Sequence, residues 1–165
     1  MQLDARSGQM EAVAARPLAE LLDCPPATGG LLTDSAESIE CDSGEIIFRQ
    51  SEPCKGLYVV VSGQFLRKAE RLKTRLNLGP ARAGELVELA AALGDGRHTY
   101  TLSALTPGSL LLLPMEQLDR AFQSYPPLRM RLLEELAREV SRAYISCCMS
   151  RIVRTRRPSS QIAQA

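Results

Sequence analysis

The chain has 165 residues and a formal net charge of +1 at pH 7, which suits one domain with a substantial core. Apolar residues make up 45% and charged residues 24%, a composition that excludes a disordered chain. The near-neutral charge argues against a protein whose whole surface grips nucleic acid. No apolar run exceeds five residues and the N-terminus lacks a secretory apolar segment, so we expect a soluble cytoplasmic protein without membrane contact.

The cysteine pattern favours a cytoplasmic protein and gives no indication of a metal site. They are five in number, with no C-x-x-C pair: Cys24, Cys41, Cys54, Cys147 and Cys148. A disulfide scaffold normally has an even number in a shorter secreted chain. Zinc and iron–sulfur sites usually draw on ligands clustered in the sequence, and His98 is the sole histidine. We therefore expect buried or idle thiols, no metal site and no resident cofactor.

Residues 1–37 are expected to form an N-terminal helical segment. Apolar side chains in residues 10–23 have helical spacing that Pro17 interrupts. The pairs Pro25-Pro26 and Gly29-Gly30 then predict breaks in the chain.

Residues 38–126 read as a β-roll followed by a short helix. Short apolar runs alternate with turn pairs such as Ser62-Gly63 and Pro107-Gly108. The predicted strands lie near residues 45–48, 57–61, 64–69, 74–78, 99–105 and 109–113. Many short strands at close spacing predict a small all-β roll or barrel, and residues 115–122 predict the helix.

Residues 127–153 predict one long helix, because no Gly or Pro occurs between Leu128 and Val153. Five of its residues repeat at heptad spacing, which predicts a homodimer through residues 128–150: Leu133, Leu136, Val140, Ala143 and Cys147. Leu132, Ile145 and Ile152 are expected to dock on the roll. The alternative is that the whole helix folds back onto its own roll. Residues 154–165 are expected to form a disordered basic tail.

The segment from Ala83 to Thr99 carries the candidate chemistry. Glu88 precedes a stretch that predicts one or two helical turns, and Arg97 follows nine residues later across a Gly-rich turn. An arginine in such a place can pair bidentately with phosphate oxygens, and a carboxylate can accept hydrogen bonds from sugar hydroxyls. On spacing alone, a Glu and an Arg around a loop more often form a surface ion pair.

Four motifs in order give the chain a family resemblance: residues 44–48, 57–63, 84–99 and 110–114. Together they resemble the cyclic-nucleotide-binding domain of the catabolite-activator/fumarate-nitrate-reductase regulator superfamily, over about residues 18–150. The resemblance implies a β-roll of the double-stranded β-helix or jelly-roll type with flanking helices and a long C-terminal dimer helix. It also implies cAMP or another cyclic nucleotide as the ligand, with Glu88 on the ribose and Arg97 on the phosphate.

The nucleotide-binding residues that the resemblance implies are Gly84, Val87, Glu88, Leu89, Ala90, Arg97, His98, Thr99 and Tyr144. Three of these positions depart from the family pattern. Val87 stands where the family usually has Gly, and a β-branched side chain hinders close approach of the backbone to a ligand. His98 and Thr99 replace the small residues that usually follow the arginine. Tyr144 aligns with the adenine-contacting region of the dimer helix.

The expected function is a stand-alone cyclic-nucleotide or small-effector sensor that signals through its C-terminal helix, not an enzyme, since no nucleophile–base set is present. The alternative is a degenerate homologue that binds no nucleotide and serves as a dimerisation or protein-interaction module with an unidentified partner. The superfamily's transcription factors continue into a helix-turn-helix domain, for which this chain leaves no room, so we expect no sequence-specific DNA binding by the chain alone.

Overall fold

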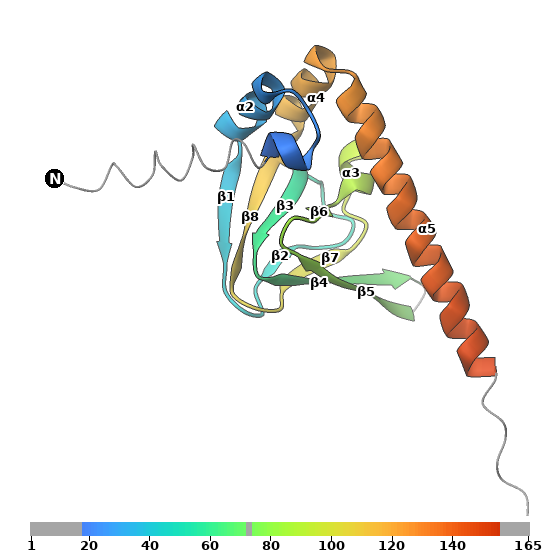
Figure 1. Ribbon diagram of the computed structural model, residues 1–165. Helices are drawn as coiled ribbons and strands as arrows, with labels where there is room; N and C mark the ends of the chain where they lie inside the picture. Colours follow the sequence, from blue (N-terminus) through green and yellow to red (C-terminus); the bar gives the residue numbers. More distant parts are fainter. Residues whose placement is uncertain (1–17, 72–73, 156–165) are drawn as a thin grey trace, which may run out of the picture.

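The computed structural model describes residues 18–71 and 74–155. Figure 1 shows a β-roll with short helices at one end and one long helix along its side. The labelled helices are α2 (Pro26–Asp34), α3 (Leu89–Leu93), α4 (Met115–Ser124) and α5 (Pro127–Thr155). The strands are β1 (Glu37–Cys41), β2 (Ile46–Phe48), β3 (Gly56–Ser62), β4 (Gln64–Arg71), β5 (Thr74–Arg82), β6 (Leu86–Val87), β7 (Thr101–Ala104) and β8 (Gly108–Pro114). The predicted β-roll with a long C-terminal helix is confirmed.

The strands form two antiparallel four-stranded sheets, with orders β1-β8-β3-β6 and β2-β7-β4-β5. Strand β3 shows why its sequence is apolar without interruption. Tyr58 and Val60 belong to the core cluster between the sheets, whereas Leu57 and Val59 belong to the cluster beneath the helices. Because successive side chains alternate between faces, a strand covered on both sides is apolar at every position.

The six predicted strands are all present, with ends shifted by a few residues, and two strands were not predicted. Strand β1 pairs only with β8, at the edge of its sheet, and most of its residues are polar and exposed. Strand β6 has two residues. Neither strand has an apolar run that a sequence pattern detects.

The predicted chain break at Gly29-Gly30 is wrong, because both glycines lie inside α2. A Cβ atom at Gly29 would lie 2.5 Å from the Cβ of Ala19, in the helical turn of residues 18–21. The glycine therefore allows this turn and α2 to pack closely, and Leu18, Leu22 and Leu32 are buried beside them. Residues 1–17 and 156–165, including Pro17 and most of the predicted tail, lie outside the described residues.

Helix α5 folds back onto its own roll in its first part and leaves the roll farther along (Figure 1). Leu128 and Leu132 are buried, and Leu136, expected in a dimer seam, packs partly against the same core cluster. Ile145, expected to dock on the roll, is instead exposed, and the side chain of Ile152 lies outside those described. No helix among the described residues is both long and apolar enough to cross a bilayer.

Candidate functional site

The segment Gly84–Thr99 enters the roll through β6, which pairs with β3, and turns sharply at Glu88. Glu88 has a φ of 73°, in the left-handed region, where a residue with a side chain is strained by about 1–2 kcal/mol. This turn starts helix α3 and directs the Glu88 carboxylate into the protein, where the side chain is fully buried. A strained residue with a buried charge requires strong local partners.

Three hydrogen bonds provide those partners. The Glu88 Oε2 atom lies 2.9 Å from Nδ1 of His98 and accepts a bond of 3.1 Å from the backbone N–H of Thr99. Its Oε1 atom accepts a bond of 2.8 Å from the Thr99 hydroxyl. Both carboxylate oxygens are therefore engaged by the protein itself, in the place where the family resemblance expected a ribose.

The chain next to Pro53 decides which way Arg97 and His98 point. Pro53 and Arg97 form an antiparallel β-bridge, and His98 donates its backbone N–H to Glu52. Since neighbouring side chains on an extended chain point to opposite sides, only one of the two residues can face the interior. His98 is buried, and Arg97 is exposed with its guanidinium donating to the Ser51 carbonyl oxygen at 3.0 Å. The predicted inward orientation of Arg97 is wrong for this structure.

Aromatic side chains hold the His98 ring inside the roll. The ring stacks on Phe48 with a centroid distance of 3.7 Å and an interplanar angle of 7°. Tyr58 lies at 6.1 Å on a tilt, and Tyr100 accepts a hydrogen bond from the Glu88 backbone N–H. Burial raises the pKa of Tyr58 to about 12 and also raises that of Tyr100. Both phenols are therefore neutral near pH 7, and they add no charge beside Glu88.

The other predicted site residues are divided between the core and the surface. Val87 and Leu89 are buried in the two different core clusters. Gly84, with a φ of +86°, stands at the start of the segment beside α5. Ala90 is half-buried, and Tyr144 is 70% exposed on α5. The structure thus brings Glu88, His98 and Thr99 together and leaves Arg97 and Tyr144 away from them.

A cavity of about 530 Å³ separates this segment from helix α5. One wall contains Gly84, Leu86 and Leu89, and the opposite wall is α5 from Arg131 to Arg142. Most binding sites for small molecules have volumes of about 300–1,000 Å³. The cavity therefore has the size of a nucleotide site and touches both the segment and the helix.

An ion pair links the roll to α5 at this cavity. Arg67 of β4 donates through Nη1 to Oε1 of Glu139 at 3.0 Å, and its side chain is only 16% exposed. Burial raises the pKa of Glu139, and the Arg67 charge opposes that rise. The sequence does not indicate this role of Arg67, because nothing in its neighbourhood points to a partner 72 residues farther along.

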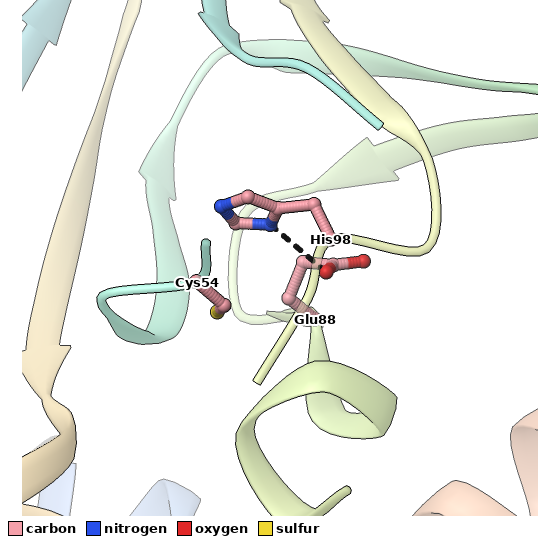
Figure 2. Close-up of side chains that lie close together, drawn as sticks. All are labelled: Cys54, Glu88 and His98. Atoms are coloured by element: carbon pink, nitrogen blue, oxygen red, sulfur yellow. Dashed lines mark hydrogen bonds and ion pairs between the residues drawn. The ribbon is translucent and has the colours of Figure 1, made fainter. Parts of the chain in front are cut away.

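Cys54 is a third chemical group beside Glu88 and His98, and sequence analysis missed it (Figure 2). Its thiol donates to the Gly56 carbonyl oxygen at 3.0 Å. Burial, and then the nearby Glu88 charge, raises the pKa of this thiol. The sulfur, a carboxylate oxygen and an imidazole nitrogen of the three residues lie within 4.8 Å of one another. Cys54 is distant from Glu88 and His98 in the sequence, so no motif connects it to them.

Several solved structures share this architecture. The sensor domain of the transcriptional regulator DNR from Pseudomonas aeruginosa has a TM-score of 0.71 and 22% identity, over 81% of this chain and 93% of that one. The Thermus thermophilus catabolite activator protein has a TM-score of 0.68 and 23% identity, over 81% of this chain and 62% of that one. The regulatory domain of Toxoplasma gondii PKA, solved with cAMP, has a TM-score of 0.72 and 15% identity, over 82% of this chain and 53% of that one. Because these identities are below 25%, the structural similarity establishes the fold alone.

The family itself follows from the sequence. The model of the cyclic nucleotide-binding domain matches residues 39–125, which is more than half of the chain. The chain therefore belongs to the cyclic nucleotide-binding domain family. Among curated proteins, no sequence matches it.

Proposed function

We propose that the protein is a regulatory domain that binds a cyclic nucleotide, or a related small anionic effector, and signals through α5. The observation that carries the proposal is the cavity of about 530 Å³ with Gly84, Leu86 and Leu89 on one side and α5 on the other. A molecule bound there would touch both the family's ligand-binding segment and the helix. Its binding energy would then depend on the position of α5, which is the requirement for signalling.

Arg67 is the proposed anion partner. Its guanidinium already pairs with a carboxylate at the cavity wall, and the same planar group pairs well with phosphate oxygens. An effector phosphate would compete with Glu139 for Arg67 and so weaken one bond between the roll and α5. The effector thus favours the arrangement of α5 in which Glu139 is released.

The proposed contacts differ from those expected from the family resemblance. Gly84 and Leu89 remain contacts because they line the cavity. Glu88 positions the turn through its bonds to His98 and Thr99 rather than holding a ribose. Glu88 or Arg97 could contact a ribose or a phosphate only if these bonds and the Arg97–Ser51 bond broke. The proposed binding mode involves no such contacts.

Nucleotide titration tests the proposal. The melting temperature of the protein is measured with increasing cAMP, cGMP and cyclic di-GMP. A nucleotide at about 100 times its dissociation constant should stabilise the fold by about 2.7 kcal/mol. Arg67→Ala should weaken binding about ten- to a hundredfold, because it removes charge-assisted bonds of about 1.5–3 kcal/mol. Arg120→Ala is the matched control, since Arg120 pairs with Glu116 on the surface of α4. No shift with any nucleotide at millimolar concentration would contradict the proposal.

A second candidate function has its own observation. Four large apolar side chains are exposed along the second half of α5: Val140, Tyr144, Ile145 and Met149. Exposed apolar side chains of this kind mark protein-binding surfaces. Val140 and Tyr144 lie one turn apart on one face of α5, and pairing with a second copy along this face would bury both. In this second function the module acts by dimerisation without any nucleotide, and the titration separates the two functions. The four free thiols described, Cys24, Cys41, Cys54 and Cys148, support a reducing cytoplasmic location in either case.

A further inference from the structure

Three potential metal ligands converge inside the roll from three separate segments (Figure 2). Cys54 lies just before β3, Glu88 at the turn before α3, and His98 in the loop before β7. Their donor atoms lie within 4.8 Å of one another, and nowhere else in residues 18–71 and 74–155 do three such ligands meet. The cluster combines one thiol, one carboxylate and one imidazole, which are the ligand types that zinc takes in proteins.

The spacing suits a single ion. In a tetrahedral zinc site, nitrogen and oxygen ligands lie about 3.3 Å apart, and nitrogen and sulfur ligands about 3.6 Å apart. The distance between His98 Nδ1 and Glu88 Oε2 is 2.9 Å, so these two atoms would separate by only a few tenths of an ångström. The sulfur lies within 4.8 Å of both, so it would move by no more than about 1.2 Å to reach the tetrahedral separation.

We propose that Cys54, Glu88 and His98 form a binding site for Zn²⁺. The Cys54 thiol loses its proton to solvent when its sulfur binds the ion. The His98 imidazole binds through Nδ1 and carries its proton on Nε2. Three protein ligands leave one position for water, as in other open zinc sites. A cavity of about 420 Å³ adjoins the cluster at His98 and is also lined by Phe48 and Tyr58.

Neighbouring groups already hold the ligands in place, as the outer ligand shell of a metal site does. The Thr99 backbone and hydroxyl fix the Glu88 carboxylate. Stacking on Phe48 fixes the plane of the His98 ring. The ion would join the start of β3, the turn before α3 and the loop before β7, so zinc should stabilise the segment Gly84–Thr99. This inference is independent of the proposed function, because it uses neither Arg67 nor the cavity at α5.

Zinc titration of the full chain tests the site. Protein stripped of metal with a chelator is titrated with Zn²⁺ by calorimetry, and then with Co²⁺ to detect the near-ultraviolet band of a thiolate–cobalt bond. We expect one ion per chain with the thiolate band. Cys54→Ser should weaken Zn²⁺ binding more than tenfold and abolish the band, whereas Cys24→Ser, the matched control at another half-buried thiol, should leave both unchanged.

Alkylation of the unmutated protein gives a readout that does not depend on a variant's folding. Iodoacetamide labelling, mapped by mass spectrometry, should show that Zn²⁺ protects Cys54 and leaves Cys24 reactive. The proposal is overturned if Zn²⁺ fails to bind saturably. It is equally overturned if binding persists in Cys54→Ser and Cys54 stays unprotected in the unmutated chain.

Discussion

Glu88→Ala is the substitution whose effect on stability can be worked out most fully from the structure. The change removes an acceptor that takes bonds from His98 Nδ1, the Thr99 backbone N–H and the Thr99 hydroxyl. Hydrogen bonds to a charged group contribute about 1.5–3 kcal/mol each. The hydroxyl can rotate, and the imidazole can shift its proton to Nε2, so part of the loss is recovered. We expect the free energy of unfolding to fall by about 3–4 kcal/mol, less than the sum of three bonds.

Glu88→Gln is the informative partner of this variant. Its amide oxygen can accept the bonds from His98 and Thr99 N–H, and its amide nitrogen can donate to the Thr99 hydroxyl. Only the charge assistance is lost, so we expect a decrease of about 1–2 kcal/mol. Urea unfolding followed by circular dichroism measures both values, with Glu134→Ala on the exposed face of α5 as a control that changes stability by less than about 0.5 kcal/mol. Equal losses for the alanine and glutamine variants would refute the hydrogen-bond account.

Three further predictions concern α2 and α5. Gly29→Ala should destabilise the fold by about 1–3 kcal/mol, because the new Cβ would lie 2.5 Å from the Cβ of Ala19. Gly30→Ala, with open space around the new Cβ, should be neutral or stabilising. Thermal unfolding measures both variants, and equal effects would disprove the packing argument. Burial raises the pKa of Glu139 above its ordinary value of 4.5, so the Glu139 carboxylate binds a proton more readily in the native state than in the unfolded state. The free energy of unfolding therefore falls as pH rises from 4.5 through the native pKa. Glu139→Gln should reduce this pH dependence of the free energy of unfolding, measured by urea unfolding at a series of pH values. An unchanged pH dependence would contradict its attribution to Glu139. Light scattering at tens of micromolar should give a dimer mass for the unmutated chain and a monomer mass for Val140→Glu, whose charge would lie in the apolar face that carries Val140 and Tyr144; a monomeric unmutated chain would exclude pairing through this face.

Most of the fold could be predicted because it depends on local pattern. The strand from Leu57 to Val61 and the strand from Ser109 to Leu113 are apolar at nearly every position, since both of their faces are covered. Helix α5 contains no Gly or Pro after its first residue. The break predicted at Gly29 is absent, because residue type alone does not distinguish a glycine that permits close helix packing from one that ends a helix.

The candidate site was less predictable because it depends on register and on distant contacts. Glu88 was predicted to contact a ribose, and no sequence pattern indicated that His98 and Thr99 hydrogen-bond to its carboxylate. Both Arg97 and His98 were predicted in the site, but beside the β-bridge between Pro53 and Arg97 the Arg97 side chain is exposed and His98 is buried, since neighbouring side chains on an extended chain point to opposite faces. Cys54 and Arg67 meet their partners only through the topology of the roll.

Hydrogen–deuterium exchange with and without a saturating cyclic nucleotide tests the central claim most directly, because it reports on the cavity and on α5 together. If the effector binds between the segment and the helix, the amides of residues 84–89 should exchange more slowly. The amides of α5 around Glu139 should exchange faster, since the bond to Arg67 is replaced. Unchanged exchange in both regions with cAMP, cGMP and cyclic di-GMP, each at millimolar concentration, would contradict the claim.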